Sequence, residues 1–156
     1  MTLTTDRLAK TITLRAKRSR VWRALTTPQE FGAWFGVAMD ADVFAPGARV
    51  TGKITAPGYE HVALEMVIER MEPERLFSYR WHPYAVEPGV DYSKEVPTLV
   101  VFTLEEVPGG ERGGTRLTVV ESGFDKVPLA RRALAYRMNS GGWDHQVEAI
   151  SRYVTA

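Results

Sequence analysis

PLARRALAYRMNSGGWDHQVEAISRYV, residues 128–154, is the one long segment of this chain that has a helical pattern of apolar residues. The apolar positions recur about every 3.6 residues and are Trp143, Val147, Ile150 and Val154. Gly141 and Gly142 interrupt the segment, and a glycine inside a helix costs about 1 kcal/mol. We therefore expect a long C-terminal helix that bends at the glycines or divides into two pieces there, with Trp143 anchoring it to a sheet.

The segments before this helix alternate apolar and polar residues, which is typical of strands. The predicted strands are residues 9–16, 39–45, 49–55, 60–71, 75–82, 98–106 and 115–122. Short turns join most of them, which implies an antiparallel sheet of about six to seven strands. One face of that sheet must be covered, and the C-terminal helix is the only long element available. The predicted fold class is therefore α+β.

Two short helices are predicted between the first two strands. Ser19 is a candidate N-cap for the first. The second begins with Thr27-Pro28-Gln29-Glu30, in which Thr27 and Glu30 have the spacing of a capping box and Pro28 stands at the first helical position. Gly36 can end this helix in the left-handed conformation.

Length and composition predict the number of domains and argue against nucleic-acid-binding and membrane-spanning proteins. A chain of 156 residues is expected to form a single domain, residues 1–156. The net charge of +1 lacks the basic excess of a nucleic-acid binder, so no nucleic-acid partner is expected. The chain has no cysteine, and no run of 18 apolar residues that would predict a membrane span. Met1–Lys10 lacks the apolar core of a signal peptide, so a cytoplasmic protein is expected.

No motif in the sequence identifies a cofactor, a metal or a catalytic triad. Gly47–Lys53 has the spacing of a phosphate loop, but Ile54 follows in place of Ser or Thr, and a strand pattern follows instead of a helix. His61, His82 and His145 are not paired at helical spacing, so no metal site is expected. The serines lack the context of a nucleophile elbow. Whether the chain is an enzyme is left open.

The order of these elements is similar to the helix-grip fold of the START-like, or SRPBCC, superfamily. Within it the chain resembles the family related to the activator of the 90-kDa heat-shock-protein ATPase, in a single-domain form. The resemblance rests on VWRAL at 21–25, TPQEF at 27–31, WFG at 34–36, FSYRW at 77–81, GTRL at 114–117, ESGF at 121–124 and GGW at 141–143. It implies a curved sheet that grips the long helix, with an apolar cavity between them. The eukaryotic co-chaperone activator has an extra domain, so a chaperone partner is not expected for this chain.

A cavity between helix and sheet predicts a set of ligand-binding residues. Large aromatic side chains and flexible methionines commonly line such pockets, and a few polar groups orient the ligand. The candidates are Met66, Tyr79, Trp81, Phe102, Glu121, Phe124, Met138 and Ser140. The loop from Pro83 to Pro97 directly follows Trp81, so we expect it to act as a lid at the mouth of the cavity.

Two charged features have alternative interpretations. Glu121 continues the inward period of Leu117 and Val119, so its carboxylate either meets an apolar face in a functional role or lies at the open rim, paired with an arginine. Arg131, Arg132 and Arg137 make one end of the last helix basic. They are either a solvated helix face or a contact for an anionic group at the mouth of the cavity.

Three functions remain in competition at this point. The first is binding of a small hydrophobic or amphipathic molecule without a cofactor. The second is a cyclase- or hydratase-like enzyme that uses an acid–base group in the cavity. The third is a protein-interaction module like the co-chaperone. The sequence also leaves open whether the chain forms a homodimer.

Overall fold

The structure is a computed structural model that describes residues 6–155, so the beginning of the Met1–Lys10 segment, where no signal peptide is expected, lies outside the described residues. A seven-stranded sheet has the order β1-β7-β6-β5-β4-β3-β2, and all neighbouring strands are antiparallel. The strands are β1 (Arg7–Leu14), β2 (Val37–Met39), β3 (Arg49–Ile54), β4 (Ala63–Glu72), β5 (Leu76–Trp81), β6 (Thr98–Glu106) and β7 (Thr115–Ser122). The helices are α1 (Arg18–Thr26), α2 (Pro28–Phe35), α3 (Leu129–Thr155) and the single 3₁₀ turns η1 (Gly110–Arg112) and η2 (Phe124–Lys126).

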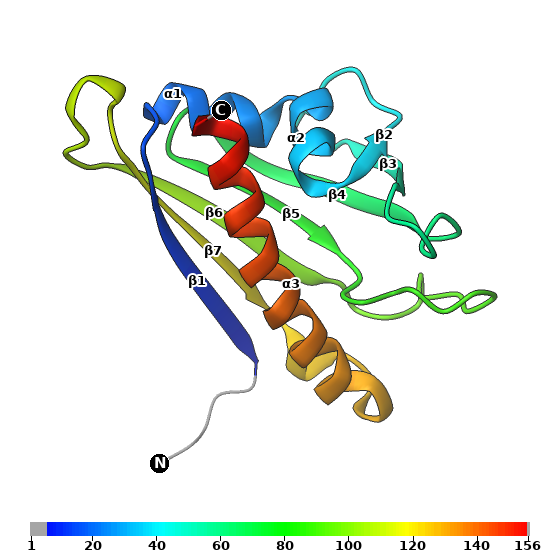
Figure 1. Cartoon of the computed structure of the whole chain (residues 1–156). Helices are drawn as coiled ribbons and strands as arrows, with labels where there is room; N and C mark the ends of the chain where they lie inside the picture. The colour runs from blue at the N-terminus through cyan, green and yellow to red at the C-terminus, as the bar shows by residue number, and fades with distance from the viewer. Residues whose placement is uncertain (1–5, 156) are drawn as a thin grey trace, which may run out of the picture.

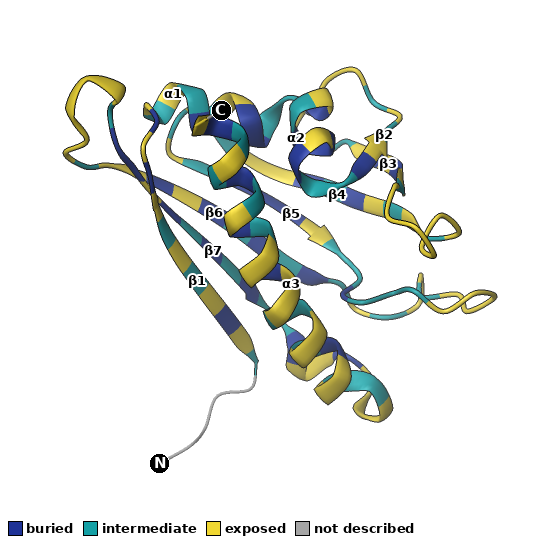
Figure 2. Cartoon of the chain, viewed as in Figure 1, coloured by how far each residue is buried: buried dark blue, intermediate teal, exposed yellow. Residues whose placement is uncertain are grey.

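The long helix α3 runs across one face of the curved sheet, and α1 and α2 cover one end of that same face (Figure 1). Period-two alternation in the strands places their apolar residues toward the helices. In β7, for example, Leu117 and Val119 are fully buried. The outward side of α3 is exposed (Figure 2). The α+β class, the antiparallel sheet and the long C-terminal helix agree with the prediction from sequence.

The prediction of a strand at residues 39–45 is wrong, because β2 ends at Met39. Phe44 is buried in the loop that follows, 5.9 Å from both the Phe31 and Phe77 rings as measured between ring centroids. Its apolar side chain therefore belongs to the core without the backbone being part of the sheet. Burial of a large aromatic ring is favourable wherever its backbone lies.

The N-cap predicted for the first helix is wrong, whereas the N-cap predicted for the second helix and its predicted end are confirmed. Helix α1 begins one residue before Ser19. Thr27 is the N-cap of α2 and Pro28 its first residue, as expected, but the Thr27 side chain makes no capping bond, so the capping box does not form. Glu30 instead accepts hydrogen bonds from Arg20 at 2.6 Å and from the Tyr153 hydroxyl at 3.1 Å. Burial alone would raise the pKa of Glu30, but these partners outweigh it and lower that pKa. Gly36 ends α2 with φ of 90°, as expected.

Helix α3 is continuous from Leu129 to Thr155, so the predicted division into two helical pieces at Gly141 and Gly142 is wrong. Both glycines lie on the exposed side of the helix. On the opposite side, Trp143, Val147 and Ile150 are buried against the sheet and α2. Tertiary packing of this apolar face outweighs the helix-breaking tendency of two glycines. No helix within residues 6–155 has the length and apolar character to cross a membrane.

Replacing Gly141 and Gly142 together by alanine is expected to stabilise the fold by about 1–2 kcal/mol. A Cβ atom at either position would meet no atom within 4 Å, and the helix already has the backbone conformation that alanine prefers. Urea unfolding of the double variant measures this gain. Gly36→Ala is the opposite control, because its φ of +90° strains any side chain. A double variant that is less stable than the parent protein would contradict the assignment of Gly141 and Gly142 to a continuous, exposed stretch of helix.

Candidate functional site

A cavity of about 540 Å³ opens at one end of the grip, and we call it the mouth pocket. Its walls are the end of β5 with the loop that follows, the β3–β4 turn with the beginning of β4, and one residue each from α2 and α3. The lining residues are Phe35, Ile54, Tyr59, His61, Val62, Ala63, Leu64, Glu65, Trp81, His82, Tyr84, Ala85, Val86, Glu87, Pro88, Gly89, Val90, Asp91, Tyr92, Ser93 and Asn139.

Behind the pocket wall, the Glu121 carboxylate is fully buried and accepts four hydrogen bonds. One oxygen, Oε2, accepts from Trp81 Nε1 at 2.7 Å and from the Thr98 hydroxyl at 2.5 Å. The other, Oε1, accepts from Asn139 Nδ2 and Trp143 Nε1, both at 2.8 Å. All four donors are uncharged. The alternative in which Glu121 pairs with an arginine at the open rim is therefore wrong, and the inward orientation is confirmed.

The fold brings these five residues together from four elements. The antiparallel register places Trp81 of β5 opposite Thr98 of β6. It places Glu121 of β7 opposite Val100, which is two residues after Thr98 in β6. Asn139 and Trp143 are four residues apart in α3 and share the face that meets the sheet. The indole rings of Trp81 and Trp143 stack with centroids 5.6 Å apart. Trp81 and Asn139 both line the mouth pocket, so they connect its wall to the buried carboxylate.

Tyr79 lies deeper on the same strand as Trp81, and its ring is fully buried. Its hydroxyl has no hydrogen-bond partner among the described residues. Burial raises the pKa of this phenol well above its ordinary value, and the negative charge of Glu121 adds to the increase. Tyr79 therefore remains uncharged, and its hydroxyl is a buried polar group without a hydrogen-bond partner among the described residues.

The predicted ligand-binding residues occupy three different environments. Met66, Tyr79, Phe102 and Phe124 are packed in the core and do not line the mouth pocket. Trp81 lines it, and Glu121 lies directly behind Trp81. Met138 and Ser140 do not line it, and the Met138 side chain is 40% exposed on the outward side of α3.

Sequence reasoning missed several residues that form the pocket walls. Phe35, Tyr84, Tyr92 and Asn139 are examples, and most of the others belong to two loops. The only signal in the sequence was the unusual length of the Pro83–Pro97 loop, because long loops often form binding sites. Asn139 gave no signal at all, since a single polar residue in a helix is ordinary.

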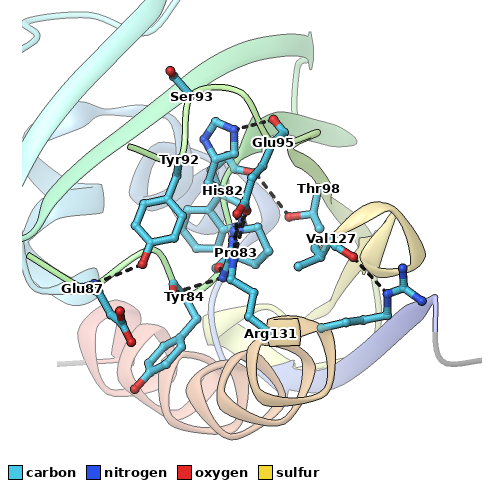
Figure 3. A network of polar contacts seen from close by, with 12 residues as sticks. His82, Pro83, Tyr84, Glu87, Tyr92, Ser93, Glu95, Thr98, Val127 and Arg131 are labelled. Carbon is cyan, nitrogen blue, oxygen red and sulfur yellow. Dashed lines mark hydrogen bonds and ion pairs between the residues drawn. The ribbon is translucent and has the colours of Figure 1, made fainter. Parts of the chain in front are cut away.

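The loop that forms one wall is attached to the first turns of α3 by Arg131 (Figure 3). The guanidinium forms a bidentate ion pair with the Glu95 carboxylate, and its Nη1 donates to the Pro83 carbonyl at 2.8 Å. It also lies 4.8 Å from the centroid of the Tyr92 ring. His82 Nε2 donates to the Glu95 carbonyl at 2.9 Å. The Arg131 guanidinium is partly buried and already neutralised by Glu95, so at this residue the solvated helix face is not observed, and the anionic partner is a residue of this chain.

Replacing Arg131 by alanine is expected to loosen this wall of the pocket while leaving the sheet intact. The variant loses the Glu95 ion pair and the contacts to Pro83 and Tyr92 together. Hydrogen exchange of amides in residues 83–97 should accelerate at least tenfold, because local opening no longer breaks these bonds. Arg137→Ala, at an exposed site of the same helix, is the matched control. Equal exchange in both variants would show that Arg131 does not hold the loop.

Solved structures of other proteins are similar to this one. The chain has a TM-score of 0.72 and 23% identity to the MLL2253 protein of Mesorhizobium loti, and the match covers 96% of each chain. A protein from Arthrobacter aurescens has a TM-score of 0.77 and 17% identity, over 97% of this chain and 87% of that one. DynU16, a putative protein in the dynemicin biosynthetic locus, has a TM-score of 0.69 and 24% identity, over 97% of this chain and 48% of that one. No curated protein is similar enough in sequence to match.

These similarities show the fold alone, a curved antiparallel sheet packed against a long C-terminal helix. The family assignment comes from the sequence, because residues 15–155 match the family described as "Activator of Hsp90 ATPase homolog 1-like protein". The matched region includes every element from α1 to α3, together with the mouth pocket and Glu121. The chain belongs to the Activator of Hsp90 ATPase homolog 1-like family.

Proposed function

We propose that this chain binds a small hydrophobic or amphipathic molecule in the mouth pocket. The observation that carries the proposal is the cavity itself, because its volume of about 540 Å³ lies within the usual range of small-molecule sites. Aromatic surface in the pocket comes from Phe35, Trp81 and Tyr84. A polar group comes from Asn139 on α3. Apolar walls with a few polar groups are the usual composition of such a site.

The family and its fold are consistent with this proposal. The cavity is present without a ligand, at the ends of β3, β4 and β5 and between the two loops that complete its walls, so the ligand need not create it. Arg131 supports the pocket from behind the loop wall through Glu95. One structural neighbour, DynU16, comes from a biosynthetic locus, which fits a domain that handles small molecules.

A cyclase- or hydratase-like enzyme, the second candidate, needs a free acid–base group in the pocket. His61 and His82 line it, but each has its Nε2 hydrogen-bonded to a main-chain carbonyl, of Val86 and Glu95 respectively. Both oxygens of Glu121 are occupied by donors. The remaining carboxylates that line the pocket, Glu65, Glu87 and Asp91, are exposed to solvent, so the geometry supports binding more strongly than catalysis.

A thermal-shift screen of flavonoids, fatty acids and polyketide-like aromatics tests the proposal. A ligand at one hundred times its dissociation constant stabilises the fold by about 2.7 kcal/mol. Ala85→Phe places a ring in the pocket wall and should abolish the shift of any hit. Ala130→Phe makes the same substitution at an exposed site of α3 outside the pocket and should preserve it. A hit that both variants bind equally would contradict binding in the mouth pocket.

A further inference from the structure

The mouth pocket has an unbalanced set of charges. Glu65, Glu87 and Asp91 all line it, whereas no lysine or arginine does so among the described residues 6–155. A fourth carboxylate, Glu121, lies behind the wall formed by Trp81 and Asn139, and its four partners are uncharged. The pocket therefore combines an apolar interior with an excess of negative charge at its solvent-exposed rim.

Two of these carboxylates have no lysine or arginine partner to neutralise them. Glu65 pairs with Arg49 on β3, but neither Glu87 nor Asp91 forms an ion pair with a lysine or arginine in the part of the chain that the structure describes. Hydrogen bonds from the side chain and backbone of Ser93 lower the pKa of Asp91, so this group is ionised at neutral pH. Arg131 is near the loop but is neutralised by Glu95.

Aromatic rings in the same walls provide a second attraction for a cation. Tyr59, Trp81 and Tyr84 all line the pocket, and the negative face of an aromatic ring attracts an ammonium group. The ring of Tyr92 already does this in the structure, with the Arg131 guanidinium 4.8 Å from its centroid. An anionic ligand would meet carboxylates with no cation to compensate them, so the same walls would reject a fatty acid or other carboxylate.

We propose that the mouth pocket selects a positively charged ligand, an apolar or aromatic body that carries an ammonium group. The body lies against Phe35 and Trp81, and the ammonium lies toward Glu87 and Asp91 on the loop. This inference rests on the proposed function and specifies its ligand class. It concerns the sign of the ligand's charge, which the volume of the cavity does not determine.

Three probes with the same naphthalene body and different substituents, CH₂NH₃⁺, CH₂OH and COO⁻, separate the two proposals. Isothermal titration at low salt and about pH 8, where free imidazole is neutral, measures their affinities. The ammonium probe should bind about tenfold more tightly than the alcohol, and the carboxylate should bind most weakly. The preference should decline when salt is added.

The double variant Glu87→Gln/Asp91→Asn should remove most of this preference while the affinity of the neutral alcohol is unchanged. The amide introduced by Asp91→Asn retains an oxygen that can accept the Ser93 backbone bond, so the loop keeps its turn. The control Asp42→Asn/Glu148→Gln removes the same net charge at exposed sites outside the pocket and should leave the preference intact. Equal binding of all three probes would overturn the charge inference and preserve the binding proposal. If none of the three probes bound, both the charge inference and the binding proposal would be overturned.

Discussion

Replacing Glu121 by alanine is expected to lower the free energy of unfolding by about 3–5 kcal/mol, a large share of the stability of a domain of this size. The substitution leaves four donors without their acceptor: Trp81, Thr98, Asn139 and Trp143. They surround a site that water does not reach, because Glu121 is fully buried. A buried donor without a partner loses its hydration without compensation. Urea unfolding measures the loss.

Two further variants test whether the stability loss comes from the buried hydrogen bonds of Glu121 or from removal of a carboxylate side chain in general. Glu121→Gln keeps one acceptor oxygen and should cost about 1–3 kcal/mol, less than alanine, because its amide NH₂ opposes two of the donors. Glu105→Ala removes an exposed carboxylate that pairs with Arg116 on the outer face of the sheet, and should cost less than about 1 kcal/mol. If alanine at positions 121 and 105 cost the same, the buried cluster would contribute nothing to stability.

Replacing Trp143 by alanine is expected to cost about 3–5 kcal/mol. Its indole is almost completely buried, stacks on Trp81, and packs edge-to-face against Phe102 and Phe35. The truncated side chain leaves a cavity between α3 and the sheet, and it also removes one donor to Glu121. The loss therefore combines apolar burial, ring contacts and one hydrogen bond.

His145→Ala is the matched control for Trp143, because this histidine is exposed two residues further along α3. Its cost should stay within about 0.5 kcal/mol. A loss below about 1 kcal/mol for Trp143→Ala would mean that the helix is docked on the sheet by other residues. The Trp143 and Glu121 substitutions share a hydrogen bond, so the cost of the double variant should be less than the sum of the two.

Strands with strong alternation were predictable in detail. The expected limits of β6 and β7, residues 98–106 and 115–122, are the observed ones. Each has a regular period of two over eight or nine residues, and a glycine-rich turn separates them. This information is local, because the side-chain period and the turn lie within one hairpin. The assignment of Phe44 to a strand failed because apolar character alone does not indicate whether the backbone is in a sheet.

The candidate site could be predicted only in part. The inward direction of Glu121 followed from its period with Leu117 and Val119. The hydrogen-bond partners of Glu121 could not be predicted in this way. Trp81 is 40 residues away in the sequence, Thr98 is 23 and Asn139 is 18, and they meet Glu121 only through strand register and helix docking. The walls of the mouth pocket lie mostly in loops, whose conformation depends on contacts such as Arg131 with Glu95.

The sequence by itself determined the α+β class, the antiparallel character of the sheet, the two short helices and the face of α3 that is buried, because periodicity and turn residues act over short distances. Tertiary structure alone decided that Gly141 and Gly142 remain in one continuous helix, since docking of Trp143 and its neighbours supplies more free energy than two glycines remove. It also decided that Glu121 is buried among uncharged partners. Four donors from three other elements converge there, and only their combined hydrogen bonds make a buried carboxylate tolerable.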